Sequence, residues 1–168
     1  MSSHPVQVSL TSPGFLSGRC FLYRIRRESV LSSFPYMKTK TIRQTVSFRA
    51  TPHEVYEALM DSKKHAKFSR DKASISRKVG GKFRAYGHYI EGKNLELKED
   101  KKIVQSWRAY TWPADYFSET TYVLTKLKDK TKLTFTHSGV PADDAEKIKK
   151  GWTDYYWKPM KEFLEKSA

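Results

Sequence analysis

Histidine, cysteine and carboxylate side chains are the groups in this sequence that most readily perform catalysis or bind metals. The single cysteine, Cys20, excludes an intrachain disulfide and a cysteine-based metal site. The histidines are isolated, because none stands at a metal-ligand spacing from another histidine, a cysteine or a carboxylate. They are His4, His53, His65, His88 and His137. The sequence therefore predicts neither a metal site nor a metal cofactor.

Motifs for nucleophilic catalysis and for phosphate binding are also missing. The sequence contains no Gly-x-Ser-x-Gly elbow, and Gly80-Gly81 lacks the further glycines of a phosphate-binding loop. Glu91 and Glu119 are candidates for a buried carboxylate, with an outward position on a strand as the alternative. His137 lies near the end of a predicted strand, which favours a place in the core or at the rim of a cavity over a role as general base. We therefore expect no catalytic constellation, no cofactor and no enzymatic activity.

Aromatic side chains form the most informative set of residues. Together with His137 they are expected to converge between a sheet and a long helix, where they either fill the core or line a cavity for a small hydrophobic ligand. The sequence leaves both alternatives open. The predicted cavity residues are Tyr86, Trp107, Phe117, Phe135, His137, Trp152, Tyr156 and Phe163.

The net charge of +14 is the strongest feature of the composition. It predicts attraction to an acidic partner, although the lysines alternate with acidic residues in clusters that are typical of solvated hairpin turns. Zinc-finger spacing, the aromatic motif of RNA-recognition domains and a recognition-helix pattern are all missing from the sequence. Specific nucleic-acid binding is therefore not predicted.

A basic run around the first predicted hairpin is the best candidate for a partner-binding surface. It consists of Arg77, Lys78, Lys82 and Arg84. Adjacent exposed cations attract an acidic surface, and the effect fades as the salt concentration rises. Trp112, in a predicted loop, is the best candidate for an exposed hot-spot residue. The alternative is that the cations are simply solvated and that Trp112 packs into the core.

Residues 1–36 differ in composition from the rest of the chain. They are rich in Ser and Arg, contain Glu28 as the single acidic residue, and show no hydrophobic period. This composition is typical of an organellar transit peptide, and the alternative is a non-native start upstream of Met37. We expect residues 1–36 to be an unstructured extension and residues 37–168 to form one domain. No apolar run reaches the ~20 residues of a membrane span. The expected location is the cytoplasm, or the mitochondrion if residues 1–36 direct import.

Helix and strand patterns follow one another in an order that limits the fold. Residues 42–50 have the pattern of a half-buried strand. Thr51 and Glu54 form a capping box that starts a short helix with Pro52 at its first position, and Asp61 caps a second helix over residues 62–68. Gly87 and Gly92 are predicted bulge or bend points in the segment that follows. Further strands are predicted over residues 73–78, 82–86, 88–97, 102–110, 117–127 and 131–138.

Residues 143–166 have the pattern of one long amphipathic helix. Pro159 removes a helix hydrogen bond to the carbonyl of Tyr155 and is expected to kink the helix. At 1.5 Å per residue the helix is roughly 36 Å long, which makes it the best cover for the predicted sheet. Its apolar residues recur at spacings of three and four: Ala145, Ile148, Trp152, Tyr155, Tyr156, Met160, Phe163 and Leu164.

The predicted fold class is therefore α+β. Short connections between successive strands require an antiparallel meander. The expected architecture is a curved antiparallel sheet that grips one long C-terminal helix, with two short helices after the first strand.

Short motifs between about residues 43 and 164 resemble, in their order and spacing, the C-terminal domain family of the activator of heat-shock protein 90 ATPase. That family belongs to the START-like superfamily of helix-grip folds. The resemblance is carried by Val79-Gly80-Gly81-Lys82-Phe83, Ile103-Val104, Trp107-Arg108, Trp112-Pro113, Phe117, Gly139-Val140-Pro141, Gly151-Trp152 and Tyr155-Tyr156.

The resemblance implies a co-chaperone that docks on heat-shock protein 90 and favours its closed, ATP-hydrolysing dimer. START-like relatives often contain a cavity, so the alternative function is that of a carrier or binding protein for a small hydrophobic ligand. The full activator has a separate N-terminal domain that supplies most of the chaperone contact. Residues 1–36 are too short to be that domain, and strong stimulation of the ATPase is therefore not implied.

Overall fold

The structure is a computed structural model that describes residues 37–166. The predicted extension over residues 1–36 lies outside the described residues, so its targeting role and the alternative start at Met37 stay predictions. No helix among the described residues is long and apolar enough to cross a membrane.

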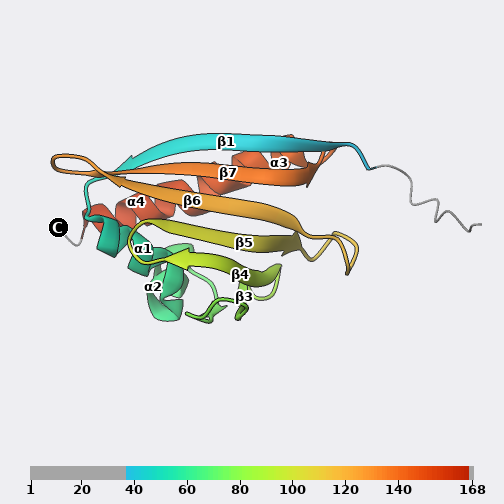
Figure 1. The fold of residues 1–168 in the computed structure, drawn as a ribbon, viewed down its shortest axis with the longest axis horizontal. Coiled ribbons are helices and arrows are strands. Elements are labelled where there is room, and N and C mark those ends of the chain that lie inside the picture. The colour runs from blue at the N-terminus through green and yellow to red at the C-terminus, as the bar shows by residue number, and fades with distance from the viewer. Residues whose placement is uncertain (1–36, 167–168) are drawn as a thin grey trace, which may run out of the picture. The chain divides into compact units, whose positions relative to one another are not determined.

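Seven antiparallel strands form one sheet in the order β1-β7-β6-β5-β4-β3-β2. Figure 1 shows β1 and β7 at one side of the sheet and β4 and β3 at the other. Six of them follow one another along the chain as the predicted meander, and β1 closes the far edge by pairing with β7 from Thr39 opposite Pro141 to Phe48 opposite Thr131. The strands are β1 (Thr39–Phe48), β2 (Ser74–Ile75), β3 (Lys82–Ala85), β4 (Ile90–Lys98), β5 (Lys102–Ala109), β6 (Ser118–Lys126) and β7 (Thr131–Pro141).

Two helices follow β1: α1 (Pro52–Met60) and α2 (Ser62–Ser69). The predicted capping box is present, because the backbone N–H of Glu54 donates to the Thr51 hydroxyl (3.2 Å) and the Glu54 carboxylate accepts from the Thr51 N–H (2.7 Å). The hydrogen bonds that the carboxylate accepts from the N–H and the hydroxyl of Thr51 lower the pKa of Glu54. Asp61 caps α2 by accepting from the N–H of Lys64 at 2.8 Å.

Replacing Thr51 with alanine is expected to lower the free energy of unfolding by about 1 kcal/mol, because the first turn of α1 loses its side-chain acceptor. Urea unfolding at neutral pH measures the effect as a lower midpoint with an unchanged slope. Thr111→Ala, at an exposed turn position, is the matched control and should change little. Equal effects of the two substitutions would contradict the cap.

The C-terminal helix runs behind the sheet and covers its inner face (Figure 1). It consists of α3 (Ala145–Gly151), a π-helical segment η1 (Trp152–Trp157) and α4 (Lys158–Glu165). The π-helical segment ends two residues before Pro159, and the kink expected at this proline stays a prediction. The predicted α+β architecture, with two short helices after the first strand, is confirmed.

Two details of the predicted strands are wrong. The strand expected over residues 73–78 shrinks to Ser74–Ile75, because the chain turns there and the carbonyl of Lys78 accepts from the Gly81 N–H and the Asn94 side chain. Gly92 is not a bulge, since the register shift in β4 lies between Asn94 and Glu96. Gly87, with φ of 57°, does lie at a bend.

Candidate functional site

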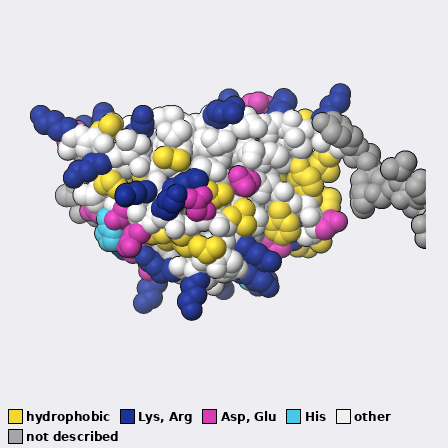
Figure 2. Space-filling view, in the orientation of Figure 1, with side chains coloured by type: hydrophobic (Ala, Val, Ile, Leu, Met, Phe, Trp, Pro, Cys, Tyr) yellow, Lys and Arg dark blue, Asp and Glu magenta, His cyan; other side chains and the backbone are white. Residues whose placement is uncertain are grey.

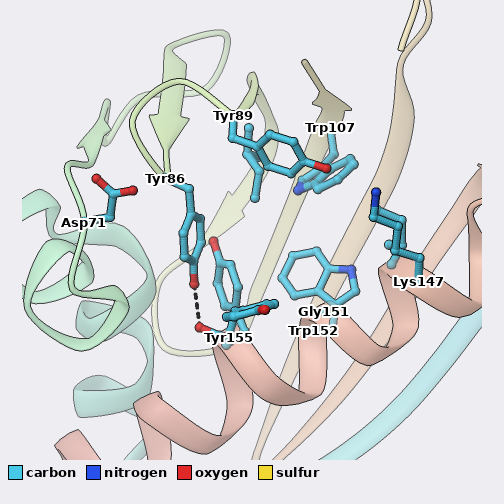
Figure 3. A pocket seen from close by; sticks show the side chains of 11 residues that line it. Asp71, Tyr86, Tyr89, Trp107, Lys147, Gly151, Trp152 and Tyr155 are labelled. Carbon is cyan, nitrogen blue, oxygen red and sulfur yellow. Dashed lines mark hydrogen bonds between the residues drawn. The ribbon is translucent and has the colours of Figure 1, made fainter. Parts of the chain in front are cut away.

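An apolar pocket of about 420 Å³ opens between the β3–β4 turn and the long helix. Figure 3 shows Tyr86 and Tyr89 on the side of the turn, and Trp152 and Tyr155 on the side of the helix. Trp107 closes the inner wall from β5. The full lining is Asp71, Tyr86, Tyr89, Ile90, Trp107, Lys147, Ile148, Gly151, Trp152, Tyr155 and Tyr156.

Four predicted cavity residues line this pocket, namely Tyr86, Trp107, Trp152 and Tyr156. Phe135 and His137 are fully buried in the core beside Trp152, with ring centroids 4.4 and 5.8 Å from its ring. Core filling and cavity lining therefore both occur in the same aromatic cluster, since Trp107, Trp152 and Tyr156 are buried in the core and also line the pocket.

Phe117 and Phe163 do not line the pocket, so these two predictions are wrong. Phe117 comes immediately before the inward-facing Ser118, and the alternation of a strand turns it to the outer face of the sheet, where the Arg108 guanidinium lies 6.0 Å from its ring. Phe163 lies two helical turns beyond Tyr156, and the Lys67 amine is 5.5 Å from its ring.

The π-helical segment shapes the pocket wall. Pro159 has no N–H to give to the Tyr155 carbonyl, and that carbonyl instead accepts from the hydroxyl of Tyr86, as the dashed line in Figure 3 shows. Tyr155 is expected on the buried face of the long helix, but 68% of its surface is exposed. Its place in the core is taken by Trp157, which sequence reasoning missed.

Gln44 is the residue in the sequence that could have indicated the buried position of Trp157. It interrupts the apolar face of β1, and the structure explains why. Its side-chain oxygen accepts from the indole N–H of Trp157 at 2.8 Å, and its amide donates to the Thr153 hydroxyl at 2.9 Å and the Lys149 carbonyl at 3.2 Å. One inward amide on β1 thus bonds both backbone and side chains of the irregular helix.

His137 holds the core next to the pocket through a chain of hydrogen bonds. Its Nδ1 accepts from the indole N–H of Trp152 at 3.0 Å, so its Nε2 carries the proton and donates to the Ser118 hydroxyl at 2.7 Å. Ser118 in turn donates to the Trp107 carbonyl at 2.8 Å. Burial lowers the pKa of His137 to about 3, which keeps the ring neutral. This arrangement is structural and offers no base to a substrate.

A second hollow, the basic groove, lies on the outer face of the sheet over β3, β4 and β5. It measures about 500 Å³ and is lined by Lys82, Phe83, Arg84, Glu91, Gly92, Lys93, Ser106 and Phe117. Figure 2 shows this face, with apolar side chains gathered toward the end that carries the β5–β6 loop and cations along its lower edge.

Glu91 is the single carboxylate in the groove. Arg108 binds it through Nη2 at 2.6 Å, and Arg84 Nε lies 3.7 Å away. The hydrogen bond from Arg108 lowers the pKa of Glu91, so the carboxylate stays charged. Lys82 and Lys93 have no carboxylate within ion-pair distance among the described residues. The groove therefore presents a cationic surface with an apolar end at Phe117.

Glu91 and Glu119 both occupy the outward strand position that was the alternative to a buried carboxylate. Glu119 is exposed on β6, opposite Ser138 of β7 and Ser106 of β5.

The predicted partner-binding set divides in two. Lys82 and Arg84 line the basic groove, whereas Arg77 pairs with Glu57 of α1 and Lys78 lies in the β2–β3 turn. The expectation that Trp112 is exposed is wrong, because only 6% of the residue is accessible. Its indole N–H donates to the Asp144 carboxylate at 2.7 Å, and its ring packs against Trp107 and Tyr116.

One group of metal-ligating side chains lies close together among the described residues. His53 of α1 meets Glu99 and Asp100 in the β4–β5 turn, with ligand atoms within 4.8 Å of one another. Sequence spacing did not reveal it, since about 46 residues separate the partners. His53 Nδ1 lies 3.1 Å from Asp100, and this polar contact accounts for the arrangement without an ion.

Comparison with known proteins decides the family. Residues 49–165 match the family described as activator of Hsp90 ATPase homolog 1-like protein. The chain belongs to this family. The pocket lining and the basic groove all lie within the matched residues of the activator-family domain, whereas β1 ends at Phe48, immediately before them.

Named relatives support the assignment to the activator family. The chain is 31% identical over 126 residues to an activator of 90 kDa heat shock protein ATPase homolog from Dictyostelium discoideum, covering 73% of this chain and 33% of that protein. It is 28% identical over 122 residues to homolog 1 from Homo sapiens, covering 73% and 36%. The crystal structure of an Hsp90 activator from Plasmodium falciparum superposes with a TM-score of 0.71 at 28% identity, covering 74% of this chain and 96% of that one.

The chain spans about a third of the length of these curated relatives. The activities of the whole relatives therefore do not transfer to this activator-family domain without a test.

Proposed function

We propose that this domain is a co-chaperone module that binds an Hsp90-type chaperone and modulates its ATPase activity. Membership of the activator family over residues 49–165 carries the proposal. The described residues contain the sheet, the two short helices and the long helix. The proposed site of action is the cytoplasm, or the mitochondrion if residues 1–36 direct import.

The basic groove is the proposed docking surface. Lys82, Arg84 and Lys93 project from adjacent strands beside an exposed aromatic ring, Phe117, which is 44% accessible. Cations around a solvent-exposed apolar residue combine electrostatic attraction with an anchor that buries apolar surface on binding. An acidic chaperone surface with a small apolar contact is the complement of this arrangement.

Binding of the full chain to an Hsp90-type chaperone, with and without ATP, is the deciding experiment. We expect association that weakens between about 50 and 300 mM salt, because the Debye length shortens. Absence of measurable association at low salt in both nucleotide states would overturn the proposal.

Reversing both charges in the double variant Lys82→Glu, Arg84→Glu is expected to weaken chaperone binding by at least about tenfold, mainly through slower association. Calorimetric titration and association kinetics measure the effect. The matched control is Lys128→Glu, Lys130→Glu, which makes the same charge change at exposed positions on the β6–β7 hairpin. If the control weakens binding as much as the groove variant, the net charge of the chain, and not the groove, is responsible.

A further inference from the structure

The pocket wall contains an indole N–H that has no acceptor. Trp107 is 3% exposed, and its Nε1 is buried without a hydrogen-bond partner among the described residues. The other tryptophans all donate: Trp112 to Asp144, Trp152 to His137 and Trp157 to Gln44. A buried donor without an acceptor costs free energy, so this exception calls for an explanation.

The ring of Trp107 cannot easily turn to find an acceptor. The rings of His137 and Trp112 pack against it, with centroids at 4.8 and 5.1 Å, and β5 fixes its backbone between β4 and β6. Figure 3 shows the indole nitrogen on the edge of the ring that is turned toward Tyr86 and Tyr89. The donor is therefore held in one direction, at the inner wall of the pocket.

The other buried donors of the pocket are already committed. The Tyr86 hydroxyl donates to the Tyr155 carbonyl, and the Tyr156 hydroxyl is 2.8 Å from His65 Nε2. Asp71 and Lys147 lie at opposite sides of the pocket, so its mouth selects neither sign of charge (Figure 3). The buried donor that remains for a ligand is therefore Trp107 Nε1, and the matching group on the ligand is one hydrogen-bond acceptor.

The shape of the pocket favours a flat ligand. Six aromatic rings line a space of about 420 Å³, which is within the range of small-molecule sites, and rings bind rings by stacking and edge contacts. Gly151 keeps the helix side open, because a Cβ there would meet only Tyr155 Cδ2, at 3.9 Å.

We propose that this pocket binds a flat, polycyclic, largely apolar molecule whose carbonyl oxygen accepts a hydrogen bond from Trp107 Nε1. The nitrogen is buried, and the carbonyl reaches it when the side chain of Tyr89, which lies beside Trp107 in Figure 3 and is 39% exposed, rotates outward. The proposal goes beyond the co-chaperone role and does not depend on it.

The test uses two probes of the same shape, 9-fluorenone and fluorene, which differ by one carbonyl oxygen. With the full chain we expect fluorenone to bind about fivefold more tightly than fluorene, the ratio that one net hydrogen bond provides. In ¹⁵N-labelled protein, fluorenone should shift the indole N–H signal of Trp107 downfield and leave that of Trp157 in place. Trp107→Phe should remove the preference for fluorenone and identifies the signal.

Gly151→Leu is the second variant, and it keeps the test valid if Trp107→Phe does not fold. Leucine at this helical position is expected to preserve the fold and to fill the pocket, weakening both probes at least tenfold. Gly151→Ala is its matched control, with a much smaller side chain. Equal affinity for the two probes, an unmoved Trp107 signal, absence of binding up to the solubility limit, or unchanged binding by Gly151→Leu would each overturn the proposal.

Discussion

The free energy of unfolding is expected to fall by on the order of 5 kcal/mol between pH 6.5 and about 4.5, because two buried histidines are held neutral in the folded protein. His65 and His137 expose 2% and 0% of their surface. Burial lowers the pKa of His65 to about 4 and that of His137 to about 3. The surrounding contacts fit neutral rings, since His137 Nδ1 accepts from Trp152 and His65 packs against Phe68 and Tyr156.

The direction of the effect follows from proton binding in the two states. Below pH 6.5 the unfolded chain protonates both histidines, whereas the folded protein does so only near pH 4 or below. The unfolded state then binds more protons, so acidification favours it. The stabilisation is complete above pH 6.5 and is lost as the pH falls toward the folded pKa values, at about 1.4 kcal/mol per pH unit for each histidine.

Urea unfolding at pH 7, 6, 5 and 4.5 measures this slope before carboxylates contribute. The pKa values of Glu57 and Glu91 are lowered by their arginine partners, so the stability that depends on those carboxylates is lost only below about pH 4.5. His65→Gln is expected to halve the slope, because one of the two groups no longer titrates. His88→Asn, at an exposed turn position with φ of 81° that asparagine tolerates, is the control and should leave the slope unchanged. A pH-independent stability in this window would contradict the neutral burial of both rings.

Hydrophobic period and local capping predicted most of the fold. The Thr51–Glu54 box, the Asp61 cap and the strand alternation depend on neighbours within a few residues, which the sequence displays directly. The long helix was likewise recognisable, because one apolar face of that length needs a sheet to cover. Pro159 did not predict the π-helical segment that precedes it, because that segment depends on contacts outside the helix.

The candidate site was less predictable because it depends on contacts between distant residues. Whether Trp112 is exposed is decided by Asp144, 32 residues away, and whether Arg77 is free is decided by Glu57. The π-helical segment moves Tyr155 to the rim and Trp157 into the core, which no regular helical period predicts. The sequence contained one sign of this arrangement. Gln44 is a polar residue on an apolar strand face, and its side chain accepts a hydrogen bond from Trp157 of the π-helical segment.

Alanine substitutions at two glycines are expected to change the free energy of unfolding in opposite directions, because Gly92 is tightly packed and Gly151 is not. Gly92→Ala is expected to lower the free energy of unfolding by about 3 kcal/mol. A Cβ at this position would lie 1.8 Å from the Ser106 carbonyl oxygen and 2.8 Å from the Phe83 ring, so β5 would have to move. Gly92 pairs with Trp107, and the movement would therefore disturb the ladder next to the aromatic pocket as well.

Gly151→Ala is the matched control, and its expected effect has the opposite sign. Gly151 ends α3 with helical backbone angles, and a Cβ there meets only Tyr155 at 3.9 Å, so alanine should raise the free energy of unfolding by up to about 1 kcal/mol through its higher helix propensity. Urea unfolding of the two variants beside the parent measures both changes. Amide exchange should also be faster along β4 and β5 in Gly92→Ala alone. A Gly92→Ala variant within about 0.5 kcal/mol of the parent would show that the two strands do not approach as closely as the structure has them.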